Sequence, residues 1–386
     1  MTEEDAVKGI DMDLDLTDEQ RAFAEAVTDF CKRETGTRQQ RDELTDGGRH
    51  AHNQGLYQKL ADLGWLEVGA GAGTMVDTCL FLEHTAYGMA PVGGFATSAI
   101  VAGAIARFGT QAQKEAVLGG VAAGRTYAIA MSEPEAGSDV AALACRAEAA
   151  DGGGFVINGQ KTWCSNAHFA DAILLVARTS GVPGDHEGLT MLLVPGTAGG
   201  LRISGIDTMG GREVNDLYFT DCRAPAGAVV GAVGQGWRQL MAGLNLERLI
   251  LAALMLGTAR RAFDDALGYV RERRQFGRPI GTFQALRHRL ADLATEIECC
   301  KLMVYRTAEL VDRDPSRVLP RESSMVKLKT TEVAREVALA GMQMMGGYGY
   351  ATEYDMERHV RAALVSTVYG GTSEIQRDII GKTLGL

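Results

Sequence analysis

A long apolar run, a surplus of basic residues and paired cysteine motifs are all missing from this chain of 386 residues. No run of 18 or more apolar residues occurs without charges, whereas a membrane-spanning helix needs about 20. The N-terminus, MTEEDAVKGIDMDLDLTDEQ, is acidic and has no apolar segment of the kind that export signals carry. We therefore expect no membrane span, no secretory or mitochondrial signal, and a cytoplasmic location.

Charge and cysteine content narrow the class of partner. The net charge is −10, whereas binding to nucleic acid needs a basic face that neutralises phosphates. An anionic cofactor can still bind through a few placed cations and helix N-termini. The seven cysteines, with Cys299 and Cys300 adjacent, follow no metal-binding or redox spacing. We expect free and mostly buried thiols, no metal site and no nucleic-acid partner.

The character of the sequence changes twice along the chain, which predicts three domains. Residues 1–126 have helical patterns, the first of which opens with a capping box at Thr17–Gln20. Residues 127–231 consist of short β-type runs separated by turn residues, with a predicted hairpin at Asn158–Gly159. Residues 232–386 hold three long helical patterns with apolar faces, which must pack on one another as a bundle.

Five motifs occur in an order that resembles the acyl-CoA dehydrogenase family of flavoproteins. They are AMSEPEAGSD, GQKTWCSNA, ERRQFGRPIGTFQ, QMMGGYGY and GGTSEIQR. The resemblance runs from about residue 14 to the end of the chain. It implies a mainly α fold with a β insert: an N-terminal α-helical domain, a central antiparallel β-barrel or sandwich, and a C-terminal four-helix bundle. It also implies FAD as the cofactor, dehydrogenation of an acyl thioester, a homotetramer, and an electron-transferring flavoprotein as partner.

By this resemblance, the cofactor contacts fall within or beside the five motifs. The residues implied are Met131, Ser132, Ser138, Trp163, Ser165, Arg273, Phe276, Gln284, Gln343, Gly346, Gly347, Thr372 and Glu374. Arg273 and Gln284 would reach the cofactor of a neighbouring subunit. Short hydroxyls suit the edge of a flavin ring, and cations or a helix N-terminus suit the pyrophosphate. Taken alone, the serines are typical of turn caps, Trp163 of β-core packing, and Gly346–Gly347 of a helix stop.

The catalytic base is expected away from the turn that reads Tyr369-Gly370-Gly371. Many family members carry Tyr-Glu-Gly there, with the glutamate as the base. Glycine keeps an amide that can polarise a thioester carbonyl, but it accepts no proton. A branch that resembles isovaleryl-CoA dehydrogenase places the base on a long helix, in the pattern Leu-Glu-Arg-Leu. GLNLERLILA supplies Glu247 at the matching position, and we interpret it as the base.

The substrate is expected beside the helix that carries Glu247 and the turn that contains Gly370. By the resemblance, Ser138, Asn245, Arg248, Tyr369 and Gly371 would contact the acyl thioester. The alternative for Glu247 is an ordinary helix salt bridge with Arg248 or with a cation one turn away. Against it, an unpaired carboxylate in an apolar stretch is costly unless it serves a purpose.

Several functions share these motifs. The glycine at position 370 leaves room for a short or branched acyl chain on CoA, which is the leading hypothesis. The thioester could instead hang on an acyl carrier protein, because the pantetheine arm is the same. A flavin monooxygenase or oxidase on the same scaffold is a third hypothesis, and a catalytically silent acyl-binding subunit is a fourth.

Overall fold

The structure is a computed structural model, and it describes residues 14–151 and 153–386. Most of the acidic N-terminal stretch, from which no export signal is expected, lies outside these residues. The chain divides by its contacts into two compact units. Unit 1 holds the chain up to Arg41, then Met75–Ala90 and Arg248–Leu386, and unit 2 holds Asp42–Thr74 and Pro91–Glu247. The boundaries of the three predicted domains stay a prediction.

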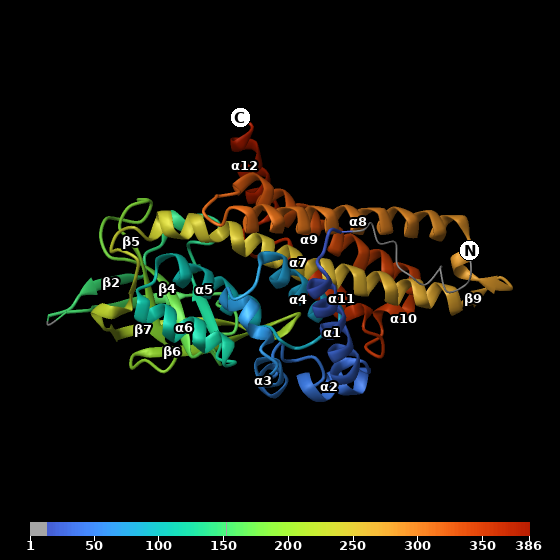
Figure 1. The fold of residues 1–386 in the computed structure, drawn as a ribbon, viewed down its shortest axis with the longest axis horizontal. Helices are drawn as coiled ribbons and strands as arrows, with labels where there is room; N and C mark the ends of the chain where they lie inside the picture. Colours follow the sequence, from blue (N-terminus) through green and yellow to red (C-terminus); the bar gives the residue numbers. More distant parts are fainter. Residues whose placement is uncertain (1–13, 152) are drawn as a thin grey trace. The chain divides into compact units, whose positions relative to one another are not determined.

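Unit 1 is helical. Its elements are α1 (Asp18–Thr35), α4 (Met75–Tyr87), β9 (Arg274–Gln275), β10 (Arg278–Pro279), η4 (Ile280–Thr282), α8 (Gln284–Arg313), α9 (Pro320–Met345), α10 (Gly347–Tyr350), α11 (Met356–Ser366) and α12 (Ser373–Thr383). Helices α2 (Arg38–Thr45) and α7 (Gly236–Glu272) have residues in both units. Helix α9 is the centre of the unit, since α8, α11 and α12 all pack against it (Figure 1).

The predicted N-terminus of the first helix is confirmed. The Thr17 hydroxyl accepts a hydrogen bond from the Gln20 amide at 3.2 Å, and the Gln20 side chain accepts one from the Thr17 amide at 3.1 Å. Among the described helices, α7 alone is long and apolar enough to cross a membrane, and 67% of its apolar window is buried. That burial is what a core helix of a helical assembly shows.

A buried charge network joins three helices of unit 1. The Glu83 carboxylate on α4 is fully buried and accepts hydrogen bonds from Arg260 on α7 and from the Tyr305 hydroxyl on α8. Burial alone would raise the pKa of Glu83, but Arg260 and the other neighbours outweigh it and hold that pKa below its usual value. Glu83 therefore stays ionised inside the helical unit.

Unit 2 combines a sheet with short helices. Its elements are α3 (Gln54–Asp62), η1 (Trp65–Ala70), α5 (Gly94–Phe108), α6 (Gln111–Ala122), β1 (Tyr127–Ala130), η2 (Val140–Ala142), β2 (Arg146–Ala149), β3 (Phe155–Lys161), β4 (Ala172–Arg178), β5 (Leu189–Pro195), β6 (Leu201–Thr208), β7 (Gly211–Ala224), η3 (Ala226–Ala228) and β8 (Val229–Val230). The strand order is β6-β7-β3-β2-β4-β5-β8, with β1 paired to β4. The order of helices, then strands, then helices along the chain is as predicted.

The sheet is mixed, whereas the resemblance implied a wholly antiparallel one. Both β1 and β2 pair with β4 in parallel: Ala130 lies opposite Leu175, and Arg146 lies opposite Arg178. The other pairs in this sheet are antiparallel. The chain between β1 and β2 leaves the sheet and returns to the same edge of β4, which is why both strands run in the same direction as β4.

The predicted hairpin at Asn158–Gly159 is wrong. Strand β3 runs straight through this dipeptide and pairs with β2 on one side and β7 on the other. The chain reverses between the end of β2 and the start of β3, where the Ala150 amide donates to the Gly154 carbonyl at 3.0 Å. Gly159 has φ +145°, and a Cβ there would lie 2.8 Å from Cys145 Cα. The glycine therefore permits the close approach of Cys145, the residue before β2, next to a register shift in the pairing with β7, and it forms no turn.

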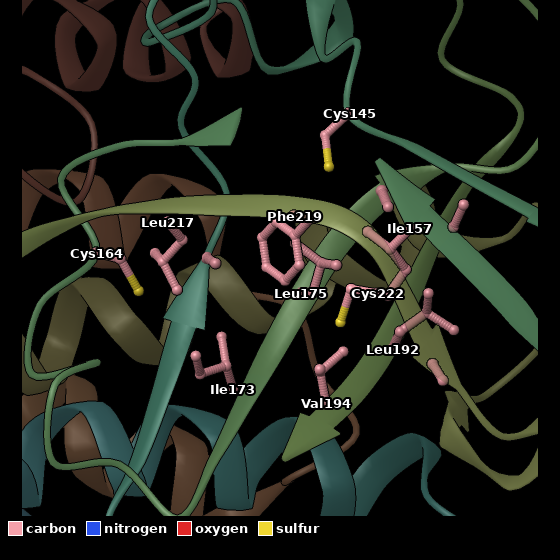
Figure 2. Packing of buried hydrophobic residues seen from close by; sticks show 14 of the residues in the cluster. Cys145, Ile157, Cys164, Ile173, Leu175, Leu192, Val194, Leu217, Phe219 and Cys222 are labelled. Atoms are coloured by element: carbon pink, nitrogen blue, oxygen red, sulfur yellow. The ribbon is translucent and has the colours of Figure 1, made fainter. Parts of the chain in front are cut away.

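The core of the sheet is made of small and branched apolar side chains. Ile157, Ile173, Leu175, Leu217 and Phe219 point toward one another from β3, β4 and β7 (Figure 2). Three cysteines, Cys145, Cys164 and Cys222, belong to the same cluster and are buried as small apolar residues. Cys145 lies just before β2, where the first predicted cofactor loop returns to the sheet, and Cys164 lies within the second, so the core anchors a point in each segment.

Candidate active site

The two predicted flavin loops lie side by side in unit 2. Met131 and Ser132 follow β1 directly, and Thr162 and Trp163 follow β3. The Thr162 amide donates to the Ser132 carbonyl at 2.9 Å, and the Lys161 ammonium donates to the Met131 carbonyl at 2.8 Å. The structure thus brings together residues that are about thirty positions apart in the sequence, and it does so through main-chain groups.

Trp163 is exposed rather than packed in the β core. Its side chain is 60% exposed, and its backbone has φ +58°, which is rare for a residue other than glycine. The flanking residues hold this conformation, since Cys164 and Asn166 donate their amides to Asn215 and Glu213 on β7 at 2.9 Å each. A strained aromatic residue fixed on both sides and presented outward is suited to lie against a flat ring.

The two loop serines do not cap turns. Ser132 and Ser165 are half-buried, and neither hydroxyl bonds to another residue of the described chain. Ser138, further along the first loop, is exposed. The alternative reading of Ser132 and Ser165 as turn caps therefore has no support in the structure, and both hydroxyls are available to a ligand.

The glycine turn of unit 1 is held by side chains from two helices. Gly370 and Gly371 have φ values of +60° and +82°. The Gln376 side-chain amide on α12 donates to both of their carbonyls, at 3.0 and 2.9 Å, and the buried Lys327 ammonium on α9 donates to the Gly371 carbonyl at 2.9 Å. Lys327 also lies over the Tyr369 ring, 5.8 Å from its centre. The turn is therefore fixed in a shape that favours glycine.

The start of the last helix is as predicted. Thr372 is the N-cap of α12, and its hydroxyl accepts from the Ile375 amide at 3.3 Å. A backbone hydrogen bond in the first turn and the Thr372 hydroxyl lower the pKa of the exposed Glu374. The Glu374 carboxylate therefore already responds to the positive end of the helix, where the sequence placed part of the cofactor.

The remaining predicted cofactor residues of unit 1 are exposed. Arg273 lies 5.5 Å from the centre of the Tyr348 ring, and Phe276, at the tip of the β9–β10 turn, is 93% exposed. Gln284 opens α8 and is exposed, and Gln343 lines a hollow of about 890 Å³ between residues of α8, α9 and α12. Gly346 ends α9 with φ +61°, as a helix stop does, and a Cβ added at Gly346 or Gly347 would meet no atom within 4 Å.

Glu247 lies on α7 among buried neighbours. It is 8% exposed, Asn245 and Arg248 are each 7% exposed, and Leu249 and Ile250 follow at 0% and 1%. The Asn245 side chain donates to the Met241 carbonyl at 3.1 Å. Successive residues of a helix point in different directions, so Arg248 does not share the face of Glu247. Helix geometry therefore disfavours a salt bridge between these two neighbours, and the other alternative, a cation one turn away from Glu247, is untouched by this argument.

Sequence reasoning did not single out the residues that hold these segments. Lys161 and Glu133 fix the two flavin loops, and Lys327 and Gln376 fix the glycine turn. Glu133, Lys161 and Gln376 lie within motifs that the sequence pointed to, whereas Lys327 lies in α9, outside all five motifs. The available signal was a charged residue at a position where the pattern called for an apolar one, as Lys161 is at the end of a buried strand. Within residues 14–151 and 153–386, no group of three or more His, Cys, Asp or Glu could hold a metal ion.

Models of three successive protein domains match the chain. They are the N-terminal, middle and C-terminal domains of acyl-CoA dehydrogenases, over residues 17–125, 128–222 and 234–385. A mitochondrial 2-methylacyl-CoA dehydrogenase of Solanum tuberosum is 34% identical over 96% of this chain and 91% of its own. A mitochondrial isovaleryl-CoA dehydrogenase of Arabidopsis thaliana is 39% identical over 72% of this chain and 68% of its own.

Solved structures share the fold over nearly the whole chain. Butyryl-CoA dehydrogenase of Megasphaera elsdenii has a TM-score of 0.87 at 28% identity, covering 97% of this chain and 100% of its own. The prolyl acyl carrier protein oxidase AnaB has a TM-score of 0.86 at 28% identity, with coverage of 96% and 100%. A glutaryl-CoA dehydrogenase of Mycobacterium smegmatis, in complex with FADH2, has a TM-score of 0.85 at 26% identity, with coverage of 96% and 95%.

FAD is the cofactor. The described residues fit it in both units. Unit 2 offers the outward-facing Trp163 and the available hydroxyls of Ser132 and Ser165. Unit 1 offers the exposed Arg273 and the open space beside the Gly346–Gly347 backbone. Each unit thus presents, by itself, groups of a kind that a flavin dinucleotide needs: an aromatic surface and hydrogen-bond partners in unit 2, and a cation and room for close approach in unit 1.

Proposed function

The chain belongs to the acyl-CoA dehydrogenase family, and on that premise we propose that it dehydrogenates a short or branched acyl-CoA with Glu247 as the base. It is an oxidoreductase that acts on CH–CH groups. The observation that carries the proposal is that the chain has glycine at position 370 and also a glutamate at position 247. The turn at 370 has a left-handed backbone that a glutamate would strain, while a buried glutamate stands on α7.

The proposed chemistry needs an acidic α-proton and a base to take it. The Gly370 amide donates to the thioester carbonyl and so polarises it, and the Glu247 carboxylate accepts the α-proton in a dry position. When bound, FAD would supply the acceptor for the β-hydride. Asn245, Arg248, Tyr369, Gly371 and Ser138 are the residues that we propose to contact the acyl thioester.

The substrate class follows from the same turn. With no side chain at position 370, space beside the acyl chain suits a short or branched substrate. The relatives named above as 2-methylacyl-CoA and isovaleryl-CoA dehydrogenases support this choice. An electron-transferring flavoprotein is the proposed acceptor of the electrons.

Anaerobic titration of the bound flavin with a panel of acyl thioesters tests the proposal. Short branched acyl-CoAs should bleach the flavin faster than long straight ones. Glu247→Gln should slow bleaching by about 10²–10⁴-fold while the affinity for FAD is unchanged. Glu25→Gln, at an exposed position on α1 that belongs to none of the five motifs, is the control and should have no effect. Equal bleaching by the wild type and Glu247→Gln would remove Glu247 as the base, and bleaching by neither would favour a silent acyl-binding subunit.

A carrier-bound substrate is the second candidate. The similarity to a prolyl acyl carrier protein oxidase supports it, since the pantetheine arm is shared between CoA and carrier proteins. Stopped-flow comparison of one acyl group on CoA and on a carrier protein separates the two. If the reduced flavin then reacts rapidly with oxygen, the oxidase or monooxygenase hypothesis gains instead.

We also propose that the chain assembles as a homotetramer. Phe276 is 93% exposed at the tip of the β9–β10 turn, close to Arg273, and exposed aromatic residues of this kind are typical of contact surfaces. Light scattering after size exclusion should give four copies for the wild type and a smaller assembly for Phe276→Ser. A monomeric wild type would contradict the assignment of Arg273 and Gln284 to a neighbour's cofactor.

A further inference from the structure

The buried Lys161–Glu133 ion pair is the contact that joins the two flavin loops. Lys161, the last residue of β3, is fully buried, and Glu133 is 8% exposed. The Lys161 ammonium donates to Glu133 Oε1 at 2.6 Å and to the Met131 carbonyl at 2.8 Å. A buried ion pair is weak evidence for stability, because desolvation offsets most of its attraction, so its placement asks for another explanation.

Glu133 holds the far end of its own loop. Its two carboxylate oxygens accept from the amides of Ala144 and Cys145, at 2.7 and 3.0 Å. Cys145 is part of the buried core of the sheet, as Figure 2 shows. One carboxylate therefore closes the loop of residues 131–145 on itself, and its lysine partner ties that closed loop to the end of β3.

The polar contacts of the pair stay within the two loops. Burial lowers the pKa of Lys161, and the nearby Cys145 and Glu133 offset this only in part. Every described polar contact of the two side chains is to the other member or to main-chain groups of the two loops. No second ion pair within the described chain competes for either residue.

We propose that Lys161 and Glu133 are positioning residues, which set the distance between Met131–Ser132 and Thr162–Ser165 and thereby the fit of both loops to the flavin. This inference rests on the proposed placement of those loops at the flavin. Neither side chain touches the acyl substrate in this proposal. Changes to the pair should therefore alter the affinity for FAD and the flavin spectrum, and not the identity of the base.

Paired neutral variants test the proposal. Glu133→Gln/Lys161→Met removes both charges together, so no unpaired charge stays buried. The matched control is Glu83→Gln/Arg260→Met, which removes a buried pair of unit 1 that contacts neither loop. We expect the first variant to bind FAD about tenfold or more weakly, as loss of a supporting shell does at other sites, and to shift the flavin absorption bands. The control should lose thermal stability with no change in either flavin property. Wild-type FAD affinity and spectrum in the first variant would overturn the proposal.

Hydrogen exchange of the wild-type protein gives a second test that needs no variant. The amides of Ala144 and Cys145, bound to Glu133, should gain protection on addition of FAD to the apoprotein. The amides of Met75 and Val76 are held in the same way by the Asp312 carboxylate, at 2.5 and 3.1 Å, and should not change. Unchanged exchange at Ala144 and Cys145 would contradict the proposal. Both tests use FAD alone, so their outcome does not depend on whether Glu247 is the base. That assignment is tested separately, by bleaching of the flavin with acyl thioesters.

Discussion

Replacement of Gly370 by alanine should destabilise the protein, although it adds only one methyl group. Gly370 has φ +60°, where an L-residue costs roughly 1–2 kcal/mol relative to glycine. Relaxation of this strain would disturb the hydrogen bonds from Gln376 and Lys327 to the carbonyls of the turn, each worth about 0.5–1.5 kcal/mol. The turn has little to gain by moving, so we expect a loss of about 1–2 kcal/mol.

Gly268→Ala is the matched control. Gly268 lies in α7 and is exposed, and a Cβ added there would meet no atom within 4 Å. Alanine at such a helical position should stabilise by about 0.5–1 kcal/mol. The two variants therefore change stability in opposite directions.

Differential scanning calorimetry of the FAD-loaded protein measures both. For a cooperative unit of 150–250 residues, 1 kcal/mol moves Tm by roughly 2–4 °C, so Gly370→Ala should lower Tm by about 2–8 °C and Gly268→Ala should raise it slightly. A rise in Tm for Gly370→Ala would refute the left-handed turn. It would also remove the steric reason for the absence of a carboxylate at position 370.

Three further changes test other parts of the structure. Glu83→Gln should lower the free energy of unfolding by about 3 kcal/mol or more, because it leaves Arg260 with a weaker buried partner. The pKa of Glu83 lies below its usual value of 4.5, so the stability that this carboxylate gives is present above that pH and is lost as the pH falls. A scan of Tm against pH should therefore show this acid-side loss in the wild type and not in the variant. Thr17→Ala should cost about 1 kcal/mol and speed amide exchange in the first turn of α1, whereas unchanged exchange would exclude the capping box. Cys299 is the one exposed cysteine of seven, so the native protein should show one fast-reacting thiol toward a disulfide reagent, and Cys299→Ser should show none.

The parts of the fold that depend on neighbours in sequence could be predicted. The capping box of α1 involves residues three positions apart, and the long helices α7, α8 and α9 repeat an apolar pattern over many turns. Helix and cap signals of this kind are local, which is why they could be found without a structure.

The errors came from contacts between distant strands. Asn158–Gly159 has the sequence of a tight turn, yet β7, some sixty residues later, pairs with β3 on both sides of this dipeptide and keeps it within the strand. The parallel pairing of β1 and β2 with β4 depends in the same way on where the chain returns to the sheet. The apolar periodicity of a single strand does not show which other strands pair with it.

The site residues divide along the same line. The motifs that contain Ser132, Trp163 and Gly370 stood out as sequence patterns, but the groups that hold them did not. Lys161 reaches Met131, and Gln376 reaches Gly370, through side-chain contacts with main-chain carbonyls. Every residue has a main-chain carbonyl, so a contact with one does not require a particular residue type and cannot be predicted from the sequence of either segment.

The pairing of β1 and β2 along one edge of β4 has a consequence for how this protein can change. Along β4, the positions opposite the end of β1 and the start of β2 are Leu175 and Arg178, about 10 Å apart at the usual rise of a strand. The chain between them, residues 131–145, could reach roughly 50 Å if extended. The two strands thus resemble one strand that is interrupted by a loop much longer than the gap it spans. Insertions or deletions in residues 131–145 should therefore leave the register of the sheet unchanged. A replacement loop would have to present a carboxylate to Lys161 and keep the residues at positions 131, 132 and 138 that are expected to contact the flavin or the substrate.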